Sequence, residues 1–183
     1  MIMTRQYKST MLVSPTRVKE SGELNINVED RQIGAAIRVA QNIYIRDVIG
    51  KDLLEKLQEL VYNKIQGSGT TIDDEPAYKT FLDEYLQDAI VYKTIIELCI
   101  RISLQIRNMG VVQNYDTNVQ TSSLDDIKYL QNYLETLYND KLNRIVEFLC
   151  QNKEAIPEGA FVCDSCKPIT KYANTNLYLG HKH

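Results

Sequence analysis

Hydrophobic positions recur with helical spacing along most of the chain and predict an all-α bundle of about four to five helices. The clearest stretch is "GAAIRVAQNIYIRDVIGKDLLEKLQELV", residues 34–61, in which two amphipathic patterns flank a single glycine, Gly50. Asn27 stands before the first pattern and is expected to cap that helix. Spacings of three and four residues place apolar side chains on one face of it: Ile33, Ile37, Ala40 and Tyr44.

Gly50 is expected to form a corner between the two helices. Glycine adopts positive φ without a steric penalty, which suits a left-handed cap at the end of the first helix. Ile49 and Leu53 complete this structural corner. The second helix is expected to stop at "GSGT", residues 67–70. Its inward positions are Leu53 or Leu54, and Leu57, Leu60, Val61 and Ile65.

A third helical pattern is expected to supply the central helix. Pro76 suits a first helical turn, and the acidic residues 73–75 favour the positive end of the helix dipole. Tyr78 to Asn108 reads as one helix of roughly 45 Å, the alternative being a kink or break near Gln87. Its second half is apolar on nearly all sides, so it is expected to be buried. Four polar residues recur on one face of it as a polar stripe, and their side chains are expected to pair with one another along the helix: Lys93, Glu97, Arg101 and Gln105.

Residues 110–121 break the helical pattern and predict a protruding loop or short hairpin. Ser122 or Ser123 then opens a last helix that runs to about Glu154, before Pro157. Its expected inward positions are Ile127, Leu130, Leu134, Leu137, Leu142, Ile145 and Leu149. The chain therefore divides into three parts: an extended N-terminal segment (1–24), a helical domain (25–157) and an extended C-terminal tail (158–183).

Composition indicates one globular domain with an acidic body. The 183 residues are 44% hydrophobic and 25% charged, which is typical of a folded chain. Residues 1–20 carry a net charge of +3, residues 157–183 carry +1, and the residues between them carry −7. A general nucleic-acid binder would show a dense Lys/Arg face instead. We expect neither a signal peptide nor a membrane span, because the sequence lacks the apolar runs of both.

Four residues near the C-terminus are candidate metal ligands: Cys163, Cys166, His181 and His183. Structural zinc sites usually space their histidines three to five residues apart, and a redox CxxC needs a βαβ setting. Cys99 and Cys150 lie in apolar helical patterns, which suggests core positions and a reducing compartment. We therefore predict no cofactor. A metal-binding helical interaction or regulatory protein that uses these Cys and His residues remains the alternative.

Catalytic patterns are missing from the sequence. The only two histidines are the ones in the tail, so no Ser/His/Asp or Cys/His triad can form on a rigid element. There is no P-loop or GxGxxG motif, and a carboxylate site in a helical bundle would need a histidine in the bundle. Adjacent acidic residues fall at helix starts or on polar faces, where they serve as caps. We expect that the protein is not an enzyme.

The stretch "AIRVAQNIYIRDVIGKDLLEKL" resembles the head–tail connector (adaptor, or neck ring) proteins of tailed bacteriophages, in particular those of crAss-like and other Bacteroidales phages. The resemblance continues through "FLDEYLQDAIVYKTIIELCIRISLQIRNMGVV" and "FLCQNKEAIPE" and covers roughly Leu24 to Pro157. Gly110 would end the central helix before the protruding loop. The matching corner positions are Ile37, Ala40, Gln41, Ile49, Gly50, Leu53 and Leu57.

This resemblance implies a structural virion protein at the phage neck, assembled in the host cytoplasm. It would form a dodecameric homo-oligomeric ring that joins the portal above to the next neck or tail ring below and continues the DNA channel. DNA would pass the lumen without sequence-specific binding, and an acidic body would repel its phosphates. Residues in non-helical segments are candidates for contacts with other subunits, portal or tail, the alternative being that these segments pack onto their own domain: Tyr7, Val112, Tyr115, Tyr172, Leu177, Tyr178 and Leu179.

The cysteine pattern gives a first test. We expect no stoichiometric zinc in the purified protein, and we expect the Cys163→Ser/Cys166→Ser variant to keep its folding and assembly, because its histidine spacing does not suit a zinc site. Metal analysis after dialysis measures this directly. One zinc ion per chain, lost in the double variant, would favour the metal-binding alternative.

Overall fold

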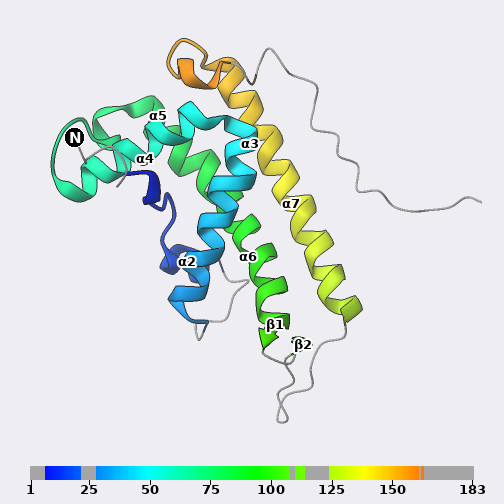
Figure 1. Ribbon diagram of the computed structural model, residues 1–183. Helices are drawn as coiled ribbons and strands as arrows, with labels where there is room; N and C mark the ends of the chain where they lie inside the picture. The colour runs from blue at the N-terminus through cyan, green and yellow to red at the C-terminus, as the bar shows by residue number, and fades with distance from the viewer. Residues whose placement is uncertain (1–6, 22–27, 108–109, 114–123, 161, 163–183) are drawn as a thin grey trace, which may run out of the picture.

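The computed structural model describes residues 7–21, 28–107, 110–113, 124–160 and 162 (Figure 1). In these residues the predicted all-α bundle of four to five helices is confirmed, together with one two-stranded hairpin. The first elements are η2 (Tyr7–Ser9), α1 (Pro15–Glu20), α2 (Asp30–Val39), the π-helical segment η3 (Ala40–Ile45) and α3 (Arg46–Ile49). Three of these, α2, η3 and α3, follow one another without a break.

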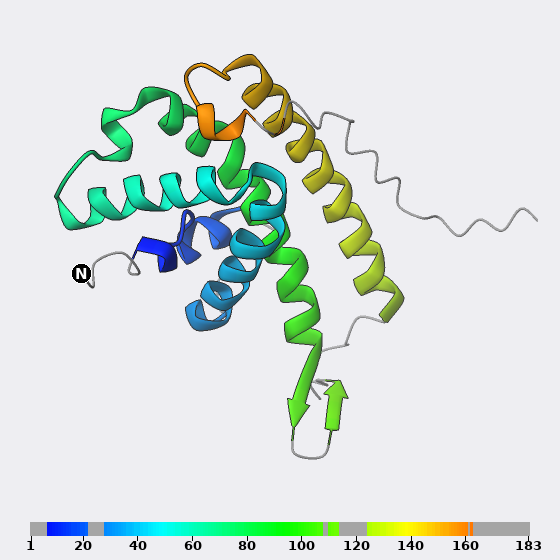
Figure 2. The same ribbon diagram turned by 45° about the horizontal axis from the view of Figure 1, so that its top comes forward.

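The remaining elements build the centre and the far side of the bundle. They are α4 (Lys51–Gln66), η4 (Ile72–Asp74), α5 (Pro76–Thr80), the π-helical segment η5 (Phe81–Leu86), α6 (Gln87–Ser103), β1 (Leu104–Arg107), β2 (Gly110–Gln113), α7 (Leu124–Gln151) and η6 (Pro157–Gly159). Helix α6 lies between α2 and α7 and contacts both (Figures 1 and 2). The hairpin projects from the end of α6 (Figure 2).

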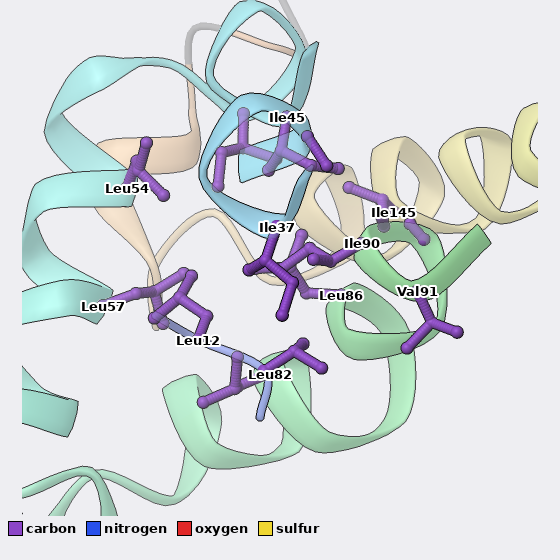
Figure 3. Close-up of a cluster of buried hydrophobic side chains, with 14 of the residues drawn as sticks. Leu12, Ile37, Ile45, Leu54, Leu57, Leu82, Leu86, Ile90, Val91 and Ile145 are labelled. Carbon is purple, nitrogen blue, oxygen red and sulfur yellow. The ribbon is translucent and has the colours of Figure 1, made fainter. Parts of the chain in front are cut away.

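The hydrophobic core surrounds α6 and explains why that helix reads as apolar on nearly all sides. Side chains from α2, α4, η5, α6 and α7 meet there, and Leu12 of the N-terminal segment lies among them (Figure 3). Phe81, Leu86, Ile90 and Leu98 are fully buried. Each side chain of this size contributes about 1.5–3 kcal/mol when it is removed from water.

The corner lies between α3 and α4. Gly50 has φ 85° and ψ 163°, so φ is positive as expected, although the conformation is not the left-handed helical one. This region of backbone space is essentially restricted to glycine. The Gly50 N–H donates to the Arg46 carbonyl (2.9 Å) and its carbonyl accepts from the Leu54 N–H (3.3 Å). One residue therefore ends α3 and begins α4, while the side chains of Ile49 and Leu53 are fully buried beside it.

The two π-helical segments change which residues face the core. A π turn is wider than an α turn and contains an extra residue, so the apolar face shifts by one position. In η3 the buried face passes from Ala40 to Ile45, and Tyr44 is only half-buried. The prediction of Tyr44 on the apolar face assumed regular α-helical spacing and is corrected here. Near Gln87, the alternative of a kink or break is replaced by the π-helical segment η5, which joins α5 to α6 without a gap.

The central helix is shorter than its hydrophobic pattern predicted. Helix α6 ends at Ser103, and β1 pairs antiparallel with β2 in the register Leu104 to Gln113 and Arg107 to Gly110. Gln105 consequently lies on a strand and does not extend the polar stripe of the helix. The hairpin begins before the predicted loop. Its strands contain the β-branched residues Ile106, Val111 and Val112, which favour strand structure. Residues 114–121 lie outside the described part.

Helix α7 presents most of the predicted inward face from Leu134 onward. Leu134, Leu142, Ile145 and Leu149 are buried, and Tyr138 joins them. Three predicted inward positions are not buried: Leu130 is exposed, and Ile127 and Leu137 are half-buried. Phe148 stacks between Phe81 and Tyr85 of η5, with ring centroids 5.7 and 4.4 Å away. In α4, Ile65 of the last turn is also exposed rather than inward.

The C-terminal end of α7 and that of the domain differ from the predicted bounds. The helix ends at Gln151, where the Asn152 N–H donates to the Phe148 carbonyl (3.0 Å), and Pro157 opens η6. Gly159 and Val162 are buried, so the domain continues past the predicted boundary at residue 157. Ser122 and Ser123, the predicted openers of the helix, lie outside the described residues.

The described part of the N-terminal segment is folded, which corrects the prediction of an extended segment over residues 1–24. Ser14 accepts a hydrogen bond from the Arg17 N–H (3.1 Å) and Pro15 occupies the first turn, so α1 has a regular N-cap. Leu12, Val13 and Val18 are buried in the core. Helix α2 begins at Asp30 with Glu29 at its N-cap, whereas the expected cap, Asn27, lies outside the described residues.

Among the described helices, none combines the length and the hydropathy that crossing a membrane requires.

The corner gives a second test. Gly50→Val should lower the free energy of unfolding by more than ~1 kcal/mol, because a β-branched residue is strained at positive φ. Gly34→Ala is a matched control: its Cβ would lie 3.8 Å from Met11 Sδ, an ordinary contact inside α2. That variant should gain roughly 0.5 kcal/mol from better helix propensity. Urea denaturation measures both, and equal stability of the two variants would contradict this account of Gly50.

Candidate functional site

Lys93 is the charged residue around which the bundle packs. It lies on α6 and is only 6% exposed. Its Nζ donates to Glu135 Oε1 of α7 (2.6 Å). The same Nζ lies 4.1 Å from the ring centroid of Tyr44 in η3 and 5.3 Å from that of Tyr138 in α7. A buried ammonium group needs a partner charge, and aromatic faces attract it. We call these four residues the Lys93 joint.

The two tyrosines of the Lys93 joint remain protonated in the folded protein. A hydrogen bond from its hydroxyl to Glu97 raises the pKa of Tyr44, and partial burial adds to this effect. Burial raises the pKa of Tyr138 well above its ordinary value, and the negative charge of Glu135 acts in the same direction. Both rings therefore present neutral aromatic faces to the Lys93 cation.

The predicted pairing along the polar stripe of α6 is wrong for Lys93. Glu97 follows it by four residues, a spacing that stabilises isolated helices, yet Lys93 bonds to Glu135 on α7. The wider turn of η3 brings Tyr44 over the ammonium group, and Glu97 accepts the tyrosine hydroxyl instead. Tertiary packing therefore outweighs the local pair.

Further polar contacts attach α7 and η6 to the rest of the bundle. Asp88 of α6 accepts from Lys141 Nζ of α7 (2.8 Å) and from Arg17 Nη2 of α1 (3.4 Å). Tyr78 Oη of α5 donates to Glu158 Oε2 of η6 (2.5 Å). Burial, followed by this hydrogen bond, raises the pKa of Tyr78. Helix α7 is thus fixed by contacts along its second half.

Two buried glutamines, Gln41 of η3 and Gln58 of α4, hold the N-terminal segment by its main chain. Gln41 Oε1 accepts from the Leu12 N–H (2.9 Å), and Gln41 Nε2 donates to the Thr10 carbonyl (2.9 Å). Gln58 Nε2 lies within hydrogen-bond distance of the Lys8 (3.2 Å) and Thr10 (3.3 Å) carbonyls. Gln41 was assigned to the corner by the resemblance alone. In the structure its amide binds a peptide group.

Large apolar side chains are exposed at the end of the bundle from which the hairpin projects. They are Tyr129 (78% exposed), Leu130 (39%) and Tyr133 (51%) on the first half of α7, together with Ile100 (48%) near the end of α6. Figure 2 shows the start of α7, the end of α6 and the hairpin at the same end of the molecule. We call these four residues the apolar end face. Exposed apolar side chains of this size mark interaction surfaces.

The sequence did not identify the apolar end face, because Leu130 was assigned to the core. A signal was present: "IKYLQNYLETLY", residues 127–138, carries apolar and aromatic residues over an arc wider than one helix face. Such an arc indicates contacts on two sides. In the structure one side packs on α6, and the other includes the two exposed tyrosines.

The predicted contact residues are mostly outside the described part. Tyr7 lies in η2, half-buried, with its ring centroid 5.9 Å from Lys8 Nζ. Val112 lies in β2, and only its backbone is described. The other contact and metal-ligand candidates fall on residues that the structure does not describe: Tyr115, Cys163, Cys166, Tyr172, Leu177, Tyr178, Leu179, His181 and His183.

The described side chains offer no alternative centre for metal chemistry. In this part of the chain, no three or more His, Cys, Asp and Glu residues are grouped so that they could hold a metal ion. Burial raises the pKa of the Cys99 thiol, which disfavours the reactive thiolate. The arrangements that stand out are therefore the two buried polar sets and the apolar end face.

The Lys93 joint gives a third test. Glu135→Ala should lower the free energy of unfolding by about 2 kcal/mol or more, because it leaves a buried cation without its carboxylate. Lys93→Met should cost less than about 1 kcal/mol, since methionine packs against the same rings and Glu135 can be hydrated. Glu147→Ala, an exposed position of the same helix, is the control. Urea denaturation followed by circular dichroism measures all three, and the reverse order of the first two would contradict the assignment.

Comparisons with known proteins place most of the chain in one family. A family model described as "Family of unknown function (DUF6712)" matches residues 45–168, which include Gln58, the Lys93 joint apart from Tyr44, and the whole apolar end face. Neither the curated proteins nor the solved structures include a match. Because the matched region is more than half of the chain, the protein belongs to this family of unknown function, DUF6712.

Proposed function

We propose that this protein is a structural virion protein that forms a ring at the neck of a tailed bacteriophage. In this role it joins the portal to the next neck or tail ring and continues the DNA channel. The resemblance of residues 24–157 to head–tail connectors supports the class of protein. The structural observation that carries the proposal is the apolar end face, which a monomer would leave in water.

A ring of identical subunits requires two different complementary faces on each subunit. The apolar end face offers large side chains from two helices, and each contributes about 1.5–3 kcal/mol when it becomes fully buried. The hairpin projects beside it (Figure 2) and extends the same end of the bundle. This end of the molecule is therefore the surface that we assign to contacts with a neighbouring subunit or with the portal.

The rest of the molecule suits a building block better than an enzyme. Among the described residues, the buried lysine, Lys93, contacts Glu135 and two aromatic rings, and the buried Gln41 and Gln58 bind main-chain groups. The net charge of −7 between residues 21 and 156 would repel DNA phosphates from a channel wall and let DNA pass. The metal-binding alternative depends on four residues outside the described part, and no contact in the described part favours it.

Assembly can be measured on the purified chain. We expect ring-shaped particles by negative-stain electron microscopy, either for the protein alone or after mixing with the cognate portal, and a matching increase in sedimentation coefficient. A chain that stays monomeric and does not bind the portal would contradict the proposed function.

The fourth test concerns the surface. The Leu130→Ser/Tyr133→Ser variant should keep its helicity and melting temperature, because these positions are exposed, but it should need at least roughly tenfold higher concentration to assemble. Ile65→Ser removes an exposed apolar residue elsewhere, at the end of α4, and should assemble normally. Sedimentation velocity compares the variants. Normal assembly of the double variant would place the contact on another surface.

A further inference from the structure

Residues 8–13 are bound through their main chain at one defined place on the bundle. The Leu12 N–H and the Thr10 and Lys8 carbonyls all contact the side-chain amides of Gln41 or Gln58. Both glutamines are buried, and a buried amide without a partner is costly. The side-chain amides of Gln41 and Gln58 therefore bind a polypeptide backbone.

Apolar contacts complete this arrangement. Leu12 and Val13 are buried, and Figure 3 shows Leu12 in the core near Leu57 and Leu82. Main-chain hydrogen bonds combined with buried side chains are the usual chemistry of peptide recognition. We call Gln41 and Gln58, with the apolar side chains that surround Leu12, the glutamine site.

The bound segment belongs to a unit that a short connection joins to the bundle. This N-terminal unit, residues 7–21, comprises η2 and α1. It is also held by ion pairs from Lys8 to Glu55 (2.8 Å) and from Lys19 to Asp30 (2.7 Å). The eight residues between Ser21 and Asp30 can span up to about 27 Å when extended. The same contacts form whichever copy supplies the unit, so exchange between copies loses none of them.

We propose that the glutamine site is a polypeptide-binding site that, in the assembled protein, takes residues 8–13 of a second copy. This inference rests on the proposed ring, in which neighbouring units are held at millimolar effective concentration. The N-terminal unit then links neighbouring subunits, with Lys8 of one copy paired to Glu55 of the next.

Isotope mixing tests the exchange on the full chain. Light and ¹⁵N-labelled chains are unfolded together, refolded, assembled and treated with a carbodiimide, which joins an amine directly to a carboxylate. The Lys8–Glu55 pair reports on the N-terminal unit. The Lys141–Asp88 pair (2.8 Å), which joins α7 to α6 within one bundle, is the control.

Complete exchange predicts that about half of the Lys8–Glu55 linked peptides combine one light and one heavy chain in the assembled fraction. The Lys141–Asp88 linked peptides should be purely light or purely heavy. Assembled rings in which both pairs are isotopically pure would overturn the exchange and leave the proposed ring intact. A protein that sediments only as a monomer would contradict the ring, and the peptide measurement below would then decide the site.

Peptide binding tests the glutamine site without assembly. Leu12→Asp should release the N-terminal unit, because a carboxylate cannot occupy the core. A fluorescent peptide of residues 7–21 should then bind that variant at least roughly tenfold more tightly than the wild-type chain, whose site is filled by its own unit. Adding Gln41→Ala to the variant should abolish this gain. A Leu12→Asp chain that remains helical and does not bind the peptide would overturn the inference.

Discussion

In the part of the chain that the structure describes, the packing depends on one buried charge, that of Lys93 in α6. Helix α6 is surrounded by the core and Lys93 is only 6% exposed, so its ammonium group needs partners within the protein. They come from two different elements: Tyr44 from η3, and Glu135 with Tyr138 from α7. Because hydrogen-bond and cation–π geometry are both directional, this one group fixes how α7 lies against α6 and η3.

The π-helical segment η3 connects this joint with the second buried polar set. Gln41 and Tyr44 lie three residues apart in it, and they serve different neighbours: Gln41 binds the main chain at Leu12, and Tyr44 covers Lys93. The extra residue of a π turn changes the angle between successive side chains around the helix axis, so the two residues can face different neighbours. The N-terminal unit and α7 are therefore both positioned by the same six-residue segment. What this packing leaves uncovered is the apolar end face, the basis of the proposed assembly.

Local signals in the sequence were sufficient for the helical bundle, the buried α6, the helix start at Pro76 and the positive φ of Gly50. They were insufficient where the outcome depends on distant residues. No sequence pattern marks the extra residue in η3. The spacing from Lys93 to Glu97 predicted a pair within the helix, whereas the partner of Lys93 is Glu135, 42 positions away. Leu130 has helical periodicity whether or not a neighbour covers it, and in the structure it is exposed. Ser14 followed by Pro15 is a local signal of a helix start, and the prediction of an extended segment over residues 1–24 overlooked it.

The direct passage from α6 into β1 sets where the hairpin lies. No residue separates Ser103 from Leu104, so the hairpin leaves the bundle where α6 ends (Figure 2). Lys93 of the same helix contacts η3 and α7. The position of the hairpin relative to both neighbours is therefore set through one helix, and a surface that the hairpin contacts would meet the molecule in one orientation.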